Sequence, residues 1–387
     1  MPAIPHMADR DRYQRGGDST GTWSSPCGGD HRYGGSVLNI IAQTAYPYSA
    51  ASARVRIAGF APVLAELGIE LHYRPTLTET QYAAVGDGHP SAARLAALVA
   101  SAAPVARAPR ATSAGLLLVH RLRSLLPIPF LEFAPRIDAY DFDDAMFAAA
   151  DLGTGIGPRL VKAEAHRWAR YVRAARLVIA GNAYLASAAR ERARRVEVVP
   201  SCVDSTRYAL REHRDQPVVT IGWVGSRTTS PFLVPVLPAV ERLNRDRLRA
   251  RLVVVGGGSL PAVRGLEQRA WSLHREAADF AEFDIGIMPL PDNQWTRGKC
   301  GYKVLQYFAA GVPVVASPVG VNAGLIGTDR GRLVSSEGDW YAALRELIGD
   351  VAARRQMGEA GRQLVASDYS YQRWGPELAE MLRSLVG

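Results

Sequence analysis

Short apolar runs of strand length alternate with amphipathic stretches along most of this chain. The first run, VLNIIAQ at residues 37–43, is followed by a helical pattern over 55–67 that ends at Gly68, and then by a run at 69–73. The same rhythm continues with runs at 116–120, 137–142, 176–181 and 196–201. Continuous apolar strands that alternate with helices are typical of parallel sheets buried on both faces. The pattern therefore predicts an α/β domain.

A second series of apolar runs follows a polar stretch. Residues 204–216 carry charge without periodicity, so we interpret them as the connection between two domains. Beyond them, strand-length runs occur at 218–225, 251–257, 283–289, 312–317 and 330–335. We therefore predict an α/β fold of two tandem Rossmann-like, doubly wound domains that face a cleft.

The ends of the chain differ from these two domains. Residues 1–35 are rich in Gly, Asp, Arg, Ser and Pro and lack periodicity, which predicts a flexible leader. The last residues have helical spacing and include ELAEMLRSLV. We expect a leader at 1–35, an N-terminal domain at 36–205, a C-terminal domain at 206–370, and a helix at 371–387 that packs back toward the N-terminal domain.

Composition narrows the function classes. The chain has 387 residues, is 48% hydrophobic and 21% charged, and contains no apolar run near the ~20 residues that a membrane span needs. Its start lacks the pattern of a signal peptide, and three widely spaced cysteines favour a reducing cytoplasm. The net charge of +9 is compatible with anionic partners such as a nucleotide or a lipid head group, and allows peripheral membrane contact.

One segment combines glycines with two of the chain's three lysines. Gly298 and Gly301 form a glycine-rich turn before a helix that is predicted to begin near Tyr302. Lys299 and Lys303 stand beside this turn. Because the first backbone N–H groups of a helix lack partners within it, a helix start with nearby lysines suits a diphosphate.

The segment 295–322, WTRGKCGYKVLQYFAAGVPVVASPVGVN, resembles the donor-binding motif of retaining glycosyltransferases with the GT-B fold, of the family-4 type (glycosyl transferases group 1). In that family a glutamate binds the ribose, and Gln306 occupies its position. An amide can also accept from one hydroxyl and donate to another. A second family glutamate falls on Gly298, so the usual contact to the distal sugar hydroxyls is missing. The competing interpretation is an ordinary βαβ unit with a glycine turn.

The loop after the run at 218–225 carries further donor candidates. Gly225 and Ser226 allow close approach of the backbone, and Arg227 offers a fork of donors to phosphate oxygens. Where the family has a lysine five residues later, this chain has Phe232, so we expect Lys299 or Lys303 to supply that charge. A surface arginine on a tight turn is the alternative.

Trp271 completes the donor set. It follows the second run of this domain and is a candidate to flank the nucleotide base. A tryptophan of the core or of an interface remains the alternative interpretation.

Two carboxylates directly follow the run at 137–142. Carboxylates at a strand end can hold an acceptor hydroxyl or a metal, and the resemblance places Asp143 and Asp144 beside the reaction centre, on the acceptor side. Either residue can instead cap the N-terminus of a helix.

The remaining acceptor-side candidates lie at two other strand ends. His120 and Arg121 end the run at 116–120, and Ser52 and Arg54 belong to the loop after the first run. Alternatively, His120 has a structural role, and Arg54 lies on the exposed face of a helix.

The resemblance implies an enzyme that moves a sugar, with retention, from a nucleotide diphosphate sugar, UDP-sugar favoured, to a hydroxyl acceptor. It implies no metal, no other cofactor and no nucleic-acid partner. The departing diphosphate would take the acceptor's proton, and Arg227 and Lys303 would stabilise its charge. A catalytically silent nucleotide-binding protein and a sugar-nucleotide epimerase share this architecture and remain alternatives.

Overall fold

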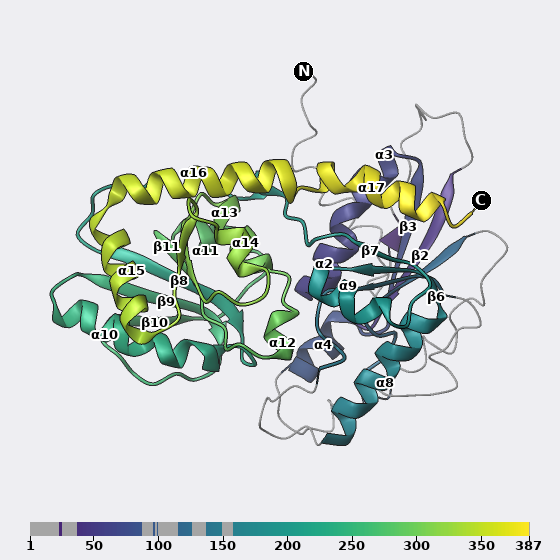
Figure 1. Ribbon diagram of the computed structural model, residues 1–387, viewed down its shortest axis with the longest axis horizontal. Coiled ribbons are helices and arrows are strands. Elements are labelled where there is room, and N and C mark those ends of the chain that lie inside the picture. Colours follow the sequence, from purple (N-terminus) through teal and green to yellow (C-terminus); the bar gives the residue numbers. More distant parts are fainter. Residues whose placement is uncertain are drawn as a thin grey trace. The chain divides into compact units, whose positions relative to one another are not determined.

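The structure of the chain is a computed structural model that describes residues 23–24, 37–86, 96, 99, 115–125, 137–148 and 158–386. It divides into two compact units. Unit 1 comprises Met1–Ala150, Thr154–Pro200 and Tyr371–Gly387, and unit 2 comprises Asp151–Gly153 and Ser201–Ser370. Each unit is built around its own sheet (Figure 1).

Within the described residues, the sheet of unit 1 has seven strands in the order β1-β3-β2-β4-β5-β6-β7. All neighbours are parallel except β1 and β3. The strands are β1 (Trp23–Ser24), β2 (Leu38–Thr44), β3 (Ile69–Pro75), β4 (Leu116–His120), β5 (Ile137–Phe142), β6 (Ala175–Ala180) and β7 (Val196–Val198). The runs predicted as strands in this part of the chain all contain one.

The predicted leader lies largely outside the described residues. Within it, Trp23 and Ser24 form β1, which pairs antiparallel with β3. The Ser24 hydroxyl also lies 2.6 Å from Nδ1 of His72. The interpretation of residues 1–35 as a leader without regular structure is therefore wrong for these two residues.

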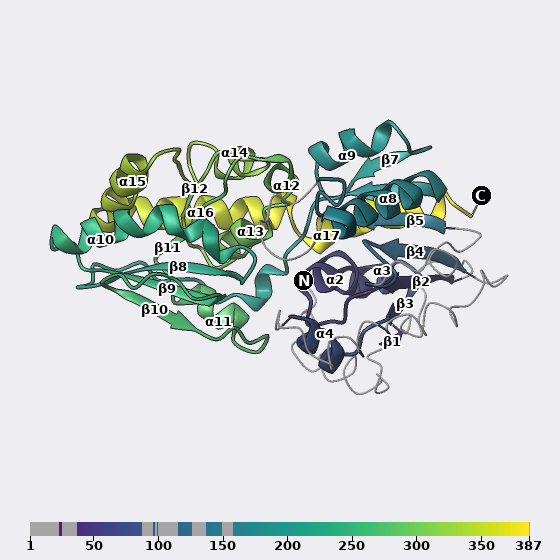
Figure 2. The same ribbon diagram turned by 90° about the horizontal axis from the view of Figure 1, so that it is seen from below.

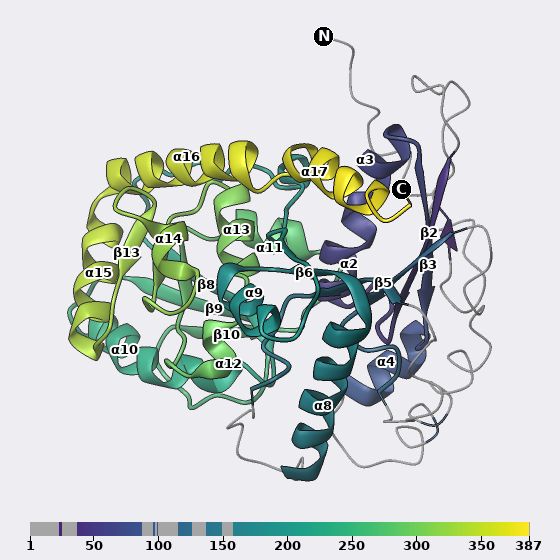
Figure 3. The same ribbon diagram turned by 45° about the vertical axis from the view of Figure 1, so that its right-hand side comes forward.

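The helices of unit 1 whose bounds are described are α2 (Ala51–Arg56), α3 (Ala61–Glu66), α4 (Glu79–Gly86), α8 (Pro158–Ala174), α9 (Ala183–Arg190) and α17 (Tyr371–Arg383), with the 3₁₀ turn η1 (Ala58–Phe60). The single helical stretch expected over 55–67 is split among α2, η1 and α3. Pro62 stands in the first turn of α3 and has no N–H for a continuous helix. At the other end of the chain, α17 packs beside α3 (Figure 3), with the Phe60 and Tyr371 rings 4.9 Å apart.

Strand β5 presents different chemistry on its two faces, because successive side chains of a strand alternate. Tyr140 stacks on Tyr171 of α8 at 5.2 Å, and Phe142 meets Trp168 edge-on at 5.9 Å. Asp141, between the two aromatic residues, points to the opposite face. One strand thus anchors the core and supplies a buried carboxylate.

Within the described residues, the sheet of unit 2 has six parallel strands in the order β10-β9-β8-β11-β12-β13 (Figure 2). The strands are β8 (Val219–Ser226), β9 (Ala250–Gly257), β10 (Leu266–Arg269), β11 (Ile285–Met288), β12 (Val314–Ala316) and β13 (Gly331–Leu333). All except β10 overlap runs predicted from the sequence. The sequence of β10, LEQR, has no apolar run because it is an edge strand that is not fully buried.

Helices cover both faces of this sheet. They are α10 (Leu237–Arg245), α11 (Glu276–Ala281), α12 (Gln294–Arg297), α13 (Tyr302–Ala309), α14 (Asn322–Ile326), α15 (Glu337–Gly349) and α16 (Val351–Asp368), with the 3₁₀ segments η2 (Ser205–Arg207) and η3 (Ser230–Val236). One core cluster joins the sheet to α10 and α15, and another joins it to α11, α13 and α14. In the described part of the chain, no helix is long and apolar enough to cross a membrane.

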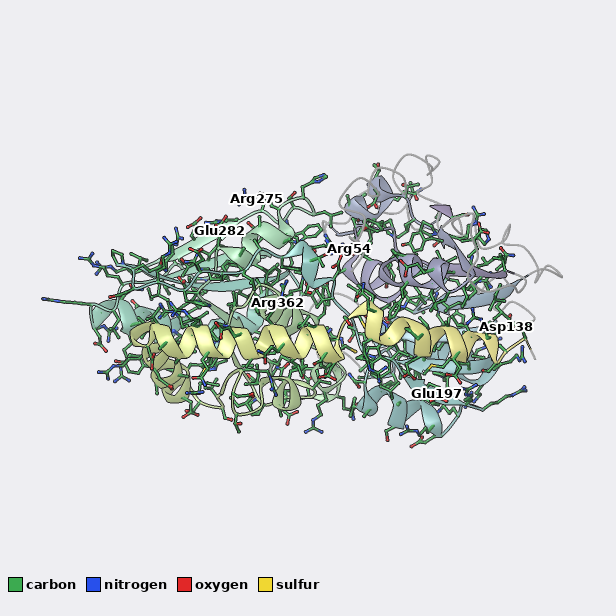
Figure 4. The ribbon with its side chains drawn as sticks, turned by 90° about the horizontal axis from the view of Figure 1, so that it is seen from above. Arg54, Asp138, Glu197, Arg275, Glu282 and Arg362 are labelled. Atoms are coloured by element: carbon green, nitrogen blue, oxygen red, sulfur yellow. The ribbon has the colours of Figure 1, made fainter. Side chains whose placement is uncertain are left out.

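Close packing of α16 fixes the position of α13. Cβ atoms added at Gly358 and Gly361 would meet the Gly311 carbonyl oxygen and the Phe308 ring at 2.0 and 2.5 Å, so larger residues would separate the helices. Arg362, labelled in Figure 4, donates to the backbone carbonyl of Ala309 at the end of α13.

The stretch predicted to connect the domains, 204–216, packs on unit 2. Arg211 donates to Asp284 at 2.9 Å, and Gln216 donates to the same carboxylate at 2.5 Å. His213 donates from Nε2 to the Gly311 carbonyl oxygen at 2.9 Å. The polar residues of this stretch therefore satisfy a buried carboxylate and a helix end, and the division between units falls at Pro200 rather than at residue 205.

Candidate functional site

The carboxyl ends of β8 and β9 approach each other closely. Gly256 and Gly257, at the end of β9, have φ values of +78° and +79°, a region that favours glycine. A Cβ atom added at Gly256 would lie 2.2 Å from the carbonyl oxygen of Gly225. These glycines therefore let the two strand ends pack backbone against backbone, next to the loop that carries Arg227.

Lys303, in the first turn of α13, reaches this strand end. Its Nζ lies 4.5 Å from the centroid of the Trp223 ring on β8. A Cβ atom added at Gly225 would lie 2.8 Å from that Nζ and 2.4 Å from Cη2 of Trp223. Gly225 therefore provides the space in which the ammonium group and the indole meet.

Lys299 has a similar aromatic contact. Its Nζ lies 3.6 Å from the centroid of the Trp295 ring on α12. Burial, together with the charge of Lys299, lowers the pKa of Lys303 to about 7. The structure thus brings together the two lysines that the sequence places four residues apart.

The start of α13 has the predicted geometry. Gly301 precedes the helix with a φ of +68°, and a Cβ atom there would lie 2.4 Å from a methyl carbon of Leu325. No side chain caps the first turn. The backbone N–H groups of this turn and the Lys303 side chain together make the N-terminal end of α13 electrostatically positive.

Other predicted donor residues lie around the same strand ends. Arg227 is exposed beyond β8, after Ser226, and its Cβ would be 3.9 Å from a Cβ added at Gly258. Trp271 is 36% exposed, and its Cβ would be 3.4 Å from a Cβ at Gly256. Both side chains therefore flank the carboxyl end of β9.

Gln306 is less accessible than its predicted role requires. It is 3% exposed, and its amide nitrogen donates to the hydroxyl of Tyr208 at 2.9 Å. Tyr302, in the first turn of the same helix, is partly buried against the core. Recognition of ribose by Gln306 thus depends on an amide whose nitrogen is already engaged.

In unit 1, the predicted acceptor residues join a buried network at the ends of β4 and β5. His120 and Asp141 are register partners on these strands, and Nδ1 of the histidine lies 2.7 Å from Oδ1 of the aspartate. Arg56 of α2 donates to both oxygens of Asp141, at 3.2 and 2.5 Å. Burial disfavours the charged form of Asp141, but Arg56 and His120 outweigh it and lower its pKa.

Arg121 connects the two strand ends to the following loop. Its Nε donates to Asp143 at 2.5 Å, and its Nη2 lies 3.6 Å from Asp144. Burial opposes ionisation of Asp143, but the charge of Arg121 holds its pKa well below the usual range. No helix begins within residues 143–148, so neither aspartate acts as a helix cap in the described part of this loop.

The arginines of α2 are buried, so the alternative of an exposed helix face is wrong. Arg54, labelled in Figure 4, is 3% exposed and donates to the Ser49 carbonyl oxygen at 2.9 Å. Arg56 is equally buried. Ser52, on the same helix, is half-buried.

His120 has one ring nitrogen that is not satisfied. The residue is fully buried, and Nε2 has no hydrogen-bond partner in the described structure. Oδ1 of Asp143 lies 4.0 Å away, beyond hydrogen-bond distance. Among the described residues, no group of three or more His, Cys, Asp or Glu side chains is arranged to hold a metal ion.

Sequence reasoning missed the partners of these residues. Trp223, Trp295 and Tyr208 contact the predicted lysines and Gln306. A local signal was available only for Trp223. Residues two apart on a strand share a face of the sheet, so the Trp223 side chain lies on the same face as Gly225, where the glycine leaves space. The partners on other strands and helices come from distant sequence and carry no local signal.

One family matches part of the chain, as glycosyl transferases group 1 over residues 218–350. No curated protein matches the sequence. The matched segment contains the ends of β8 and β9, both lysines and α13.

Solved structures are similar over nearly the whole chain. Sucrose-phosphate synthase from Thermosynechococcus elongatus is 12% identical, with a TM-score of 0.64 over 90% of this chain and 99% of that one. WaaG, a glycosyltransferase involved in lipopolysaccharide biosynthesis, is 14% identical, with a TM-score of 0.63 over 89% and 99%. A UDP-forming α,α-trehalose-phosphate synthase from Burkholderia xenovorans is 12% identical, with a TM-score of 0.56 over 91% and 100%. These likenesses define the fold.

Proposed function

We propose that this chain, which has the GT-B fold and a segment that matches glycosyl transferases group 1, transfers a sugar from a nucleoside diphosphate sugar to a hydroxyl acceptor with retention of configuration. The observation that carries this proposal is the Lys303 ammonium group at the carboxyl end of β8, beside the uncapped start of α13. That combination suits the two phosphates of a donor.

Unit 2 supplies the electrostatic part of the reaction. The bond between the anomeric carbon and a diphosphate oxygen breaks, and the acceptor oxygen bonds to the same face of that carbon. The acceptor's proton passes to the departing diphosphate. Arg227, Lys299, Lys303 and the N–H groups of α13 stabilise the negative charge that develops on the diphosphate, since preorganised donors are most effective there.

Unit 1 supplies the groups for the acceptor. Nδ1 of His120 contacts Asp141, and Nε2, which has no partner among the described residues, can hydrogen-bond to a hydroxyl of the acceptor. Asp143 and Asp144 pair with Arg121, and their remaining oxygen lone pairs can accept from other hydroxyls. The acceptor is a small molecule, a natural product or a glycolipid.

A UDP-sugar is the donor we favour. Support comes from the UDP-forming trehalose-phosphate synthase that shares this fold. Trp271 is exposed at the end of β9, where an indole can stack on a base. Gln306 would contact the ribose through its carbonyl oxygen while its nitrogen remains on Tyr208.

The test is a donor panel of UDP-, GDP-, ADP- and TDP-sugars with mixed hydroxyl acceptors. We expect release of the free nucleoside diphosphate from one donor, with a glycosylated acceptor as the second product. A changed sugar nucleotide formed without acceptor would identify an epimerase instead. Binding of a nucleotide without turnover of any donor would identify a silent nucleotide-binding protein, an outcome that Gly298 at the position of a family glutamate favours.

A further inference from the structure

Buried cations usually contact a carboxylate, but Lys303 instead contacts an aromatic ring. Its Nζ lies 4.5 Å from the Trp223 centroid, and none of its contacts in the described structure is an ion pair. Lys299 is the charged group that acts on it most strongly. A carboxylate partner would cancel the lysine's charge, whereas an indole attracts the cation through its quadrupole and leaves the charge in place.

The contact between lysine and tryptophan is built into the strand ends. Trp223 is 1% exposed within the core cluster that includes α10 and α15, so its ring cannot swing away. A Cβ at Gly257 would lie 3.3 Å from Cζ3 of the ring, and a Cβ at Gly225 would collide with both ring and ammonium. Two glycines therefore border the indole and leave room for the lysine.

We propose that Trp223 is a positioning residue of the donor site, whose indole face holds the Lys303 ammonium group at the carboxyl end of β8 so that its uncompensated charge meets the donor diphosphate. This inference rests on the proposed function. Trp223 itself touches no reacting atom, and it acts by fixing where the cation lies. Gly225 is required for the same contact, because only a residue without Cβ leaves room for Lys303 beside Trp223.

One measurable consequence is the uptake of a proton when a diphosphate binds. Because burial and the charge of Lys299 lower the pKa of Lys303 to about 7, part of the free protein carries a neutral lysine near neutral pH. A bound diphosphate favours the charged form, so binding takes up a proton. As pH rises from 6 to 8, the apparent Kd for the diphosphate should therefore increase.

The experiment is calorimetric binding of UDP, GDP, ADP, TDP and inorganic pyrophosphate to the full chain, in two buffers of different ionisation enthalpy. Trp223→Leu is expected to raise Kd about 10-fold, with a smaller effect on kcat than on KM. Trp223→Phe, which keeps a ring, should raise Kd about 3-fold. At pH 7 the parent should take up more protons on binding than Lys303→Met does.

Two further variants separate positioning from stability. Trp340→Leu removes another indole of the same core cluster, 4% exposed, and should lower Tm without changing Kd or proton uptake. Gly225→Ala keeps Trp223 but fills the contact space, and should weaken binding even if Trp223→Leu does not fold. Parent-like binding and proton uptake in folded Trp223→Leu or Gly225→Ala would overturn the inference. Failure of the parent to bind any of the five probes would overturn the proposed function itself.

Discussion

In unit 1, Arg56 and Arg121 each contact a carboxylate, whereas in unit 2 Lys303 contacts an indole ring. The arginine pairs are internally neutral, so they fix the positions of His120 and of the strand ends without attracting an anion. The lysine has no carboxylate partner, so burial makes its charged form costly and lowers its pKa. One unit uses cations to organise polar groups, and the other holds a cation ready for an anionic ligand.

Removal of charge from unit 2 should have the largest effect. Lys303→Met and Arg227→Ala are each expected to lower kcat/KM about 100-fold or more, because each removes a donor from charge that develops on the diphosphate. Steady-state kinetics with the donor identified by the panel measure this. Arg345→Ala, at an exposed arginine of α15, is the matched control and should retain parent activity. Near-normal turnover of both site variants would contradict the claim that unit 2 supplies positive charge to the diphosphate.

A neutralised carboxylate in unit 1 should have a smaller effect on activity. Asp143→Asn leaves Arg121 without its closest charge partner, and we expect acceptor kcat/KM to fall about 10-fold while donor binding is retained. Acceptor and donor titrations separate the two quantities. Asp138→Asn is the control: this buried carboxylate at the amino end of β5 pairs with Arg176 at 3.3 Å and should affect Tm without affecting acceptor use.

The same substitution has a defined dependence on pH. The pKa of Asp143 is lower in the folded protein than the usual ~3.9, so its stabilising contribution is present above that value and is lost as pH falls through the acid range. The Tm difference between parent and Asp143→Asn should therefore be largest near neutral pH and shrink below about pH 4. A difference that grows in acid would contradict the assigned ion pair.

The comparison also shows what the sequence could predict. Most strand positions followed from apolar runs, with β1 and β10 as exceptions, and the start of α13 followed from Gly301 and Tyr302, because these signals are local. Side-chain partners did not follow: Arg56 and Asp141 are 85 positions apart, and Gln306 and Tyr208 are 98 apart. Sequence spacing placed the lysines near one another, but the ring that holds Lys303 belongs to a strand whose register is set by the whole sheet.

Gln306 offers a finer test, because its side chain is buried and its amide nitrogen already donates to Tyr208. Gln306→Ala should raise donor KM about 5-fold with little change in kcat, since it removes the proposed contact to ribose and one hydrogen bond of Tyr208. Gln306→Glu should stay within about 2-fold of the parent, because Tyr208 can donate to the new carboxylate. Donor KM that is unchanged in Gln306→Leu would remove this residue from the donor site.

Addition of a chelator should have the smallest effect, although unit 1 carries three carboxylates at Asp141, Asp143 and Asp144. Each of them is within 3.6 Å of an arginine nitrogen, from Arg56 or Arg121, so a divalent cation would have to displace a charge partner that is already in place. In unit 2 the lysines and the start of α13 already supply positive charge of the kind a metal would bring to the diphosphate. We therefore expect turnover in excess EDTA to equal turnover without it, measured as released nucleoside diphosphate. Loss of activity in chelator that Mg²⁺ or Mn²⁺ restores would show that these carboxylates exchange their arginine partners for a metal, and the contrast between the two units would then have to be redrawn around that ion.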